Sequence, residues 1–197
     1  RHERCAVKPL PASLEGTPQL WRGRQRRHAI PALSTGHECL DACLPGGGWP
    51  VGALTELLTP VEGIGEFSLL LPALAAVTRS ERWAILVDPP WVPYPPSLCG
   101  HGLSLDRLLL VRTGNAKESL WACEQALRQV RGGMTVAWLE KPGFTQLRRL
   151  QMAARASQQA AVLLRPAETA HSASPAALRL QLEAGPADTR VRVLKCR

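Results

Sequence analysis

Short apolar runs alternate with longer amphipathic segments through the middle of this sequence. Residues 83–87 and 108–111 are uninterrupted apolar runs, and 134–139 contains a single threonine among apolar residues. Runs of this length, bounded by polar or turn residues, are typical of strands buried on both faces of a sheet. Residues 53–58 and 160–164 have a similar character, so five core strands are predicted.

Three longer segments carry apolar residues at the spacing of one helix face. The second of them follows Asn115, whose side chain can cap the first turn of a helix. Pro72 lies within the first segment, so that helix should begin near Ser68 or be distorted. The predicted helices span residues 69–77, 116–130 and 144–157, after a shorter one between 33 and 44.

The last part of the chain changes to strict alternation of apolar and polar residues. Residues 178–183 and 191–194 both follow this period of two, which predicts an antiparallel pair of strands. Strands and helices alternate before that pair. The predicted fold is therefore α/β, with a mostly parallel twisted sheet, helices on both faces and a C-terminal antiparallel hairpin.

Positive charge is concentrated near the start of the chain. The 197 residues suffice for one domain with its own core, and the net charge is +8. Residues 1–28 contain seven Arg and Lys against two Glu. This stretch either lies along a nucleic acid with Trp21 stacked on a base, or is a solvated arm that docks Trp21 on its own domain or on a partner protein. The arginines that flank Trp21 are Arg22, Arg24, Arg26 and Arg27.

Several classes of protein are disfavoured by what the sequence contains. The six cysteines form no CxxC pair, so we expect reduced thiols and no metal site. No uncharged apolar run approaches the roughly 18 residues that a membrane span needs, and no secretory leader is visible. We expect a cytoplasmic protein with no membrane partner.

The segment after residues 53–58 has the layout of a phosphate-binding loop without its chemistry. Such a loop uses glycines to bring backbone N–H groups to a phosphate, a lysine for the β- and γ-phosphates, and a hydroxyl for Mg²⁺. Gly63 lies in this loop, Gly65 matches its last glycine, Glu66 takes the lysine position and Phe67 the hydroxyl position, while Ser68 comes one residue late. A carboxylate repels a triphosphate where a cation attracts it, a difference of several kcal/mol, by an order-of-magnitude estimate of about 4 kcal/mol per close charge pair. We expect a structural turn, with no cofactor.

The segment ahead of this loop resembles the RecA ATPase core. The resemblance also includes the order of the later strands and helices and the final hairpin, and it extends over about residues 32–195. Together with the charge distribution, it leads us to expect a basic N-terminal arm, residues 1–31, followed by a RecA-like domain with a degenerate phosphate loop, residues 32–197. The matching positions, at the family's spacing, are 34–36 (STG), 40–41 (LD), Leu44, 47–48 (GG), Pro50, Gly52 and Glu56.

Two further positions of the RecA pattern have lost their chemistry here. The family places a catalytic Glu two residues after a strand-end Asp, and counting from Asp88 that position holds Pro90, which cannot act as a base. The family's Mg²⁺-supporting Asp is replaced by Glu140 at best. We therefore predict a protein that is not an enzyme. Glu56, at a RecA-like position, is predicted to end its strand and cap a loop.

Within the RecA superfamily the chain is most similar to the ImuA family, which is associated with translesion synthesis in bacterial mutagenesis cassettes. The shorter SulA division inhibitors resemble the chain over residues 69–74 and at Arg165 and Pro166, but their likeness is weaker over residues 34–58. The stretches that suggest ImuA are 21–23 (WRG), 44–49 (LPGGGW), 52–58 (GALTELL), 63–66 (GIGE), 69–74 (LLLPAL), 137–139 (AWL) and 147–151 (LRRLQ).

The ImuA resemblance implies an accessory factor of SOS-induced, error-prone translesion synthesis at the nucleoid. Its implied partners are an ImuB-like polymerase adaptor, RecA and an error-prone C-family DNA polymerase, with single-stranded DNA as a further candidate. The alternatives are a SulA-like division inhibitor, a weak DNA-dependent ATPase and a purely structural scaffold. Outside the arm, the candidate DNA-binding residues are Arg165, Arg190, Arg192, Lys195 and Arg197.

Overall fold

The computed structural model describes residues 31–185 and 189–196. Its main sheet has the strand order β5-β4-β6-β7-β3-β8-β9, and every neighbouring pair is parallel except the final β8–β9 hairpin. These strands are β3 (Ala53–Thr59), β4 (Ala84–Val87), β5 (Leu108–Val111), β6 (Met134–Trp138), β7 (Ala160–Pro166), β8 (Leu178–Ala184) and β9 (Thr189–Cys196).

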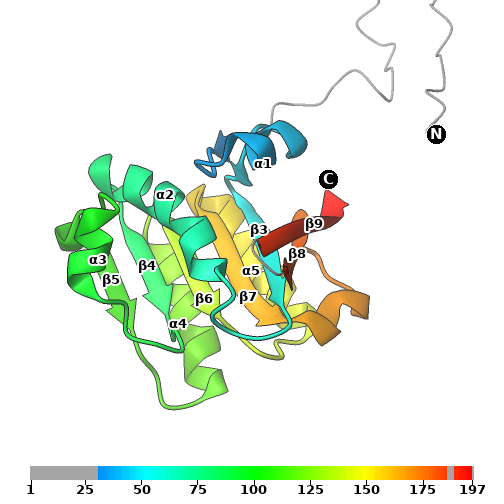
Figure 1. Ribbon diagram of the computed structural model, residues 1–197. Helices are drawn as coiled ribbons and strands as arrows, with labels where there is room; N and C mark the ends of the chain where they lie inside the picture. Colours follow the sequence, from blue (N-terminus) through cyan, green and yellow to red (C-terminus); the bar gives the residue numbers. More distant parts are fainter. Residues whose placement is uncertain (1–30, 186–188, 197) are drawn as a thin grey trace, which may run out of the picture.

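Helices cover both faces of this sheet (Figure 1). Helix α2 (Glu66–Arg79) packs on one face, and α4 (Ala116–Gln129) and α5 (Phe144–Ser157) pack on the other. Neighbouring residues of β4 therefore enter different cores: Leu86 faces the α2 side and Ile85 the α4–α5 side. Because alternate residues of a strand point to opposite faces and both faces are covered by helices, every residue of such a strand is buried. This explains why these strands are continuous apolar runs. The predicted α/β architecture is confirmed, hairpin included.

Shorter elements complete the described part of the chain. A two-residue strand, β1 (Ala32–Leu33), pairs with β2 (Trp49–Pro50) beside the main sheet. None of the helices in residues 31–185 and 189–196 has the length and apolar character needed to cross a membrane. The short helices are α1 (Glu38–Cys43), α3 (Pro95–Gly100), η2 (Leu105–Arg107) and η3 (Ala167–His171).

Strand β5 corrects one sequence prediction. Its apolar run was expected to be buried, yet Leu109 is 46% exposed and Leu110 is 37% exposed. The reason is topological, because β5 is the end strand of the sheet and, in the part of the chain that the structure describes, pairs only with β4. An apolar run alone does not distinguish a central strand from an edge strand, so the prediction of burial was wrong.

Helix α2 begins at Glu66, two residues before the predicted start. Pro72 therefore lies in the helix interior, where it supplies no backbone N–H to the preceding turn. A contact with another segment accompanies this position: a β-carbon added to Gly36 would lie only 2.3 Å from the Pro72 Cβ. The turn that contains Gly36 thus packs directly on the proline ring. Pro72 is therefore part of a packing contact between this turn and α2.

The same turn explains part of the RecA-like sequence pattern. The Asp41 carboxylate accepts hydrogen bonds from the Ser34 hydroxyl, 2.6 Å, and the Thr35 backbone N–H, 2.9 Å. Burial alone would raise the pKa of Asp41, but these hydrogen bonds and nearby His37 lower it below its ordinary value. The residues of this turn that match the RecA pattern thus form a hydrogen-bonded turn, and through Gly36 this turn packs on α2.

Candidate functional site

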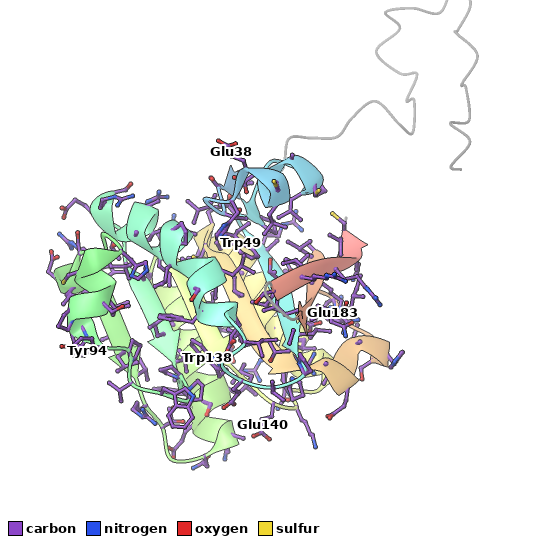
Figure 2. All side chains as sticks on the ribbon, viewed as in Figure 1. Glu38, Trp49, Tyr94, Trp138, Glu140 and Glu183 are labelled. Carbon is purple, nitrogen blue, oxygen red and sulfur yellow. The ribbon has the colours of Figure 1, made fainter. Side chains whose placement is uncertain are left out.

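An open cleft of about 870 Å³ lies where the central parallel strands end. Residues from the carboxyl ends of β3, β4, β5, β6 and β7 line it, together with the first turn of α4. In open α/β sheets ligands bind at this edge. Trp138 and Glu140 mark the edge in Figure 2, below the start of α2. The cleft is therefore the region in which any chemistry inherited from a RecA-like ancestor would be found.

The loop between β3 and α2 is occupied by its own carboxylate. Gly65 has a φ of 103°, a left-handed conformation that favours glycine, and directly precedes α2. Glu66 is the first residue of that helix, and its Oε1 accepts a hydrogen bond of 2.7 Å from the Gly63 backbone N–H. In a phosphate loop the backbone N–H groups point at the phosphate. Here one of these groups, the Gly63 N–H, is already hydrogen-bonded to the Glu66 side chain.

The neighbouring positions of the loop also serve packing. The Phe67 and Trp138 ring centroids are 6.2 Å apart with their planes tilted by 47°, a favourable aromatic contact between α2 and β6. Ser68, the displaced hydroxyl, is exposed. Thr189 of β9 closes the loop from the other side, because its hydroxyl donates a 2.6 Å hydrogen bond to the Ile64 carbonyl oxygen. The sequence did not predict this contact between the loop and the hairpin.

Asp88, the strand-end acid, is committed to a structural role. It follows β4 with a φ of 49°, and its two carboxylate oxygens accept 2.6 Å hydrogen bonds from the backbone N–H and the hydroxyl of Thr113. Burial by itself would raise the pKa of Asp88, but hydrogen bonds from Ser119 and Thr113 outweigh it and hold the pKa below its ordinary value. Asp88 therefore links the ends of β4 and β5.

The other two positions of the lost ATPase pattern lie nearby. Pro90 lines the cleft two residues after Asp88. Glu140 is exposed, follows the end of β6 and lines the same cleft beside Lys141. Within residues 31–185 and 189–196, no group of three His, Cys, Asp or Glu side chains is arranged to hold a metal ion.

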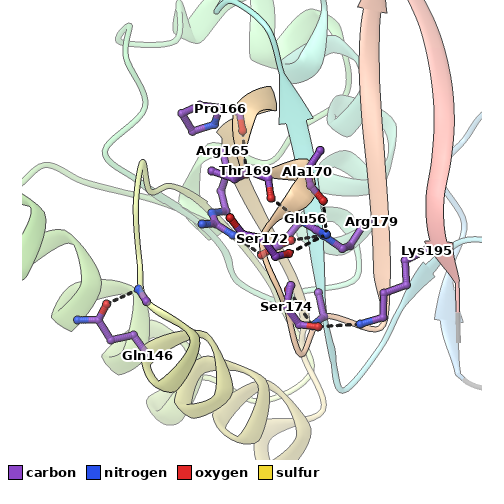
Figure 3. Close-up of polar contacts among 12 residues, drawn as sticks. Glu56, Gln146, Arg165, Pro166, Thr169, Ala170, Ser172, Ser174, Arg179 and Lys195 are labelled. Carbon is purple, nitrogen blue, oxygen red and sulfur yellow. Dashed lines mark hydrogen bonds and ion pairs between the residues drawn. The ribbon is translucent and has the colours of Figure 1, made fainter.

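Glu56 lies in the middle of β3, fully buried, and corrects two sequence predictions (Figure 3). Its Oε1 accepts a 2.6 Å bond from Arg165 of β7, and its Oε2 accepts a 2.6 Å bond from Arg179 of β8. Glu56 therefore does not end a strand or cap a loop. Arg165 is only 4% exposed, so the prediction that it contacts DNA does not fit its placement.

Sequence reasoning missed Arg179 as an organising residue. Besides Glu56, its guanidinium donates to the backbone carbonyl oxygens of Thr169, Ala170 and Ser172, and so holds the segment that follows β7 (Figure 3). Arg179 occupies a polar position in the alternating pattern of residues 178–183, yet it is only 6% exposed. One signal could have identified it. If β8 lies between two other strands, an arginine on that strand can be buried, and a buried arginine needs an anionic partner.

The remaining DNA-binding candidates fall into two groups. On β9, Arg190 is exposed, the Arg192 side chain is 63% exposed and 3.0 Å from Glu183, and the Lys195 ammonium donates a 2.8 Å hydrogen bond to the Ser174 carbonyl oxygen. The others lie outside the described residues. These are Trp21, Arg22, Arg24, Arg26 and Arg27 of the arm, and Arg197.

Comparison with known proteins places these features in context. No protein-family model matches the chain. Over 136 residues, 64% of the chain, it is 32% identical to "Protein ImuA" from two strains of Caulobacter vibrioides, and covers 54% of that protein. Over 106 residues, 54% of the chain, it is 31% identical to "Protein RecA" of Marinobacter nauticus, and covers 30% of it. The chain thus spans about half the length of the ImuA proteins it matches.

Proposed function

We propose that this ImuA-like, RecA-related chain is a non-catalytic accessory factor of SOS-induced, error-prone translesion DNA synthesis. The observation that carries the proposal is the Glu66 carboxylate, which sits inside the former phosphate loop and accepts the Gly63 N–H. An ATPase needs the backbone N–H groups of this loop free for the phosphates, and a lysine beside them. A protein that keeps the fold but has a carboxylate in this loop is suited to act by binding partner molecules.

Two neighbouring features support the absence of ATP turnover. Glu140, at best an imperfect substitute for the family's Mg²⁺-supporting Asp, is an exposed side chain just past the end of β6. Pro90 offers no group that could orient or deprotonate an attacking water. Restoring a single one of these positions would not restore hydrolysis, because phosphate binding, metal support and water activation are separate requirements.

The resemblance to ImuA and RecA suggests the partners. In this proposal the RecA-like domain, residues 32–197, presents its surface to RecA or to an ImuB-like polymerase adaptor, which works with an error-prone C-family DNA polymerase. The basic arm, residues 1–31, and the exposed Arg190 and Arg192 of β9 hold single-stranded DNA near the lesion. Phosphate contacts of this kind need no sequence-specific readout.

Damage-induced mutation frequency tests the proposal in the bacterium that encodes the chain. Deletion of the gene should abolish the damage-induced increase, and the wild-type gene should restore it. The Ser68→Ala variant should restore it equally, because Ser68 is the hydroxyl next to the loop that an ATP-dependent factor would need for Mg²⁺. Ser68 is exposed, so its removal should leave the fold intact.

Two results would contradict this account. Normal damage-induced mutagenesis in the deletion strain would remove the chain from translesion synthesis. Filamentous cells on overproduction, with unchanged mutagenesis, would favour the division-inhibitor alternative.

A further inference from the structure

A second, smaller pocket of about 240 Å³ lies beside the filled loop. We name it the aromatic pocket. Its walls come from the start of α2, the loop after β4 and the end of β6. The residues that line it are Gly63, Gly65, Glu66, Phe67, Ser68, Pro89, Pro90, Trp91, Pro93 and Trp138.

One polar side chain in this pocket is left half-satisfied. Glu66 is only 5% exposed, and while its Oε1 is used by Gly63, its buried Oε2 has no hydrogen-bond partner among the described residues. A buried carboxylate oxygen without a partner is costly, so its presence in a native fold calls for an explanation. The nearby Trp138 Nε1–H is likewise buried without an acceptor in the described part of the chain. Both atoms are covered in this structure, so an incoming group can pair with them only if the Glu66 and Trp138 side chains turn toward the pocket.

The composition of the walls limits what can occupy the pocket. A nucleoside triphosphate would meet the Glu66 carboxylate, and the volume is below the roughly 300–1,000 Å³ of pockets for drug-sized ligands. A metal ion would find a single carboxylate oxygen. A purely apolar group would leave Glu66 Oε2 unpaired. A planar cation satisfies the walls best, because guanidinium groups pair with carboxylates and stack on aromatic faces.

The rim of the pocket indicates that the cation belongs to a protein. Trp91 is 73% exposed, and beyond it Val92 is 63% and Tyr94 is 70% exposed. Large apolar side chains clustered on one loop are typical of a protein interaction surface. Prolines occupy four of the positions between 89 and 95, which fixes the backbone of this loop and lowers the entropy that binding would cost.

We propose that the aromatic pocket receives one arginine side chain from a partner protein. On binding, the Glu66 and Trp138 side chains turn toward the pocket. The guanidinium then donates to Glu66 Oε2, and the Trp138 Nε1–H donates to a main-chain carbonyl oxygen of the same partner segment. Apolar residues beside that arginine cover Trp91, Val92 and Tyr94. Replacement of the family's lysine by Glu66 thereby inverts the specificity of the site from a phosphate to a cation. This inference deepens the proposed function. It rests on one part of that function, namely that the chain acts by binding other proteins.

Two blocked peptides provide the test, acetyl-Leu-Arg-Leu-amide and the same peptide with citrulline in place of arginine. Citrulline keeps the shape of arginine and removes its charge. The full chain, labelled with ¹⁵N, is titrated with each peptide while the indole N–H signals are followed, and the Trp138 signal is assigned with the Trp138→Phe variant. The arginine peptide should shift the Trp138 signal saturably, and the citrulline peptide should bind at least about tenfold more weakly, the factor expected for about 1.4 kcal/mol.

Two variants complete the experiment. Glu66→Gln keeps an acceptor for Gly63 and removes the charge, so it should weaken the arginine peptide by about tenfold or more, again about 1.4 kcal/mol. Glu62→Gln removes an exposed charge from the same loop and should leave binding unchanged. The comparison between peptides on the wild-type chain stands even if Glu66→Gln folds poorly.

Equal binding of the two peptides, no saturable shift at millimolar arginine peptide, or undiminished binding by a folded Glu66→Gln variant would overturn the inference. Failure here combined with loss of mutagenesis in the deletion strain would remove only the arginine pocket. Failure in the mutagenesis assay with a positive peptide titration would remove the translesion role and keep the pocket.

Discussion

Glu56 and Glu66 lie on either side of the same loop and use their carboxylates differently. Glu56 is fully buried and has both oxygens paired with guanidinium groups. Glu66 is nearly as buried and has one oxygen paired with a backbone N–H. The first arrangement pairs the whole carboxylate and serves the fold, whereas the second leaves one buried oxygen without a partner among the described residues. At the residue scale, this difference separates a fully paired carboxylate from a half-paired one.

Replacing Glu56 by Gln should destabilise the protein strongly. The change leaves Arg165 and Arg179 buried without a counter-charge, and breaking a buried ion pair in this way costs about 3–5 kcal/mol. Urea denaturation measures the loss as a lower midpoint. The matched control is Glu183→Gln, which breaks the exposed pair with Arg192 and should cost less than about 1 kcal/mol. Equal losses in the two variants would contradict the role assigned to the buried triad.

Asp88 should make stability depend on pH in the acid range. Because its pKa is lower in the folded than in the unfolded chain, its contribution is fully present above the unfolded pKa and is lost as the pH falls through the folded pKa. Asp88→Asn should lower stability at neutral pH by about 1–3 kcal/mol through weaker bonds to Thr113. It should also flatten the acid dependence of the urea midpoint. A variant with the wild-type acid profile would assign that dependence to other groups, such as Asp41.

At the scale of elements, the N-terminal turn and α2 fit each other through Gly36 and Pro72. Gly36 has a φ of 80°, and a Cβ there would overlap the Pro72 ring. Gly47 has a similar φ of 74°, but nothing lies within 4 Å of the position its Cβ would take. The two glycines therefore share the same backbone requirement and differ only in packing.

Gly36→Ala should cost more stability than Gly47→Ala. Both variants carry the strain of a left-handed backbone, roughly 1–2 kcal/mol, and Gly36→Ala adds an overpacking cost of about 1–3 kcal/mol. Thermal unfolding of the two variants side by side measures the difference. Equal transition temperatures would show that the turn does not press on α2.

Much of the element order could be predicted from the sequence, because buried strands and amphipathic helices leave local patterns. Helix α5 begins and ends where predicted, and Asn115 caps α4 through hydrogen bonds from Lys117 and Glu118. The exposed edge strand β5 could not be predicted, since strand order is a property of the whole sheet. The burial of Arg165 was hidden for the same reason, because its partner Glu56 is 109 residues away.

The degenerate loop was predictable and the aromatic pocket was not. The exchange of lysine for Glu66 is visible in a single position of the sequence. The free Oε2 depends on how that side chain turns toward Gly63, and the walls depend on Trp138 and the 89–93 loop meeting across the ends of two strands. Such contacts are set by tertiary packing and carry no local periodicity.

At the scale of the whole molecule, the net charge of +8 favours an anionic partner. If the arm and β9 both hold single-stranded DNA, binding should weaken as salt rises, with a logarithmic slope that falls by about 0.7 for each phosphate contact removed. The variant with Arg22, Arg24, Arg26 and Arg27 changed to Ala should therefore show a shallower slope. Fluorescence anisotropy of labelled single-stranded DNA across a salt series measures it.

Arg190→Ala combined with Arg192→Ala provides the comparison on β9, where both side chains are exposed. A shallower slope in the arm variant alone would assign DNA contact to the arm. Unchanged slopes in both variants, or the absence of binding by the wild-type chain, would shift the account to protein partners.

The most direct test of the central claim is a calorimetric titration of the full chain with MgATP, with and without single-stranded DNA, using RecA as the positive control. The account predicts no saturable heat and no release of phosphate from the chain, because the Glu66 carboxylate occupies the phosphate loop. Saturable MgATP binding that displaces the arginine peptide from the Trp138 signal would contradict it, and would restore the loop as a nucleotide site.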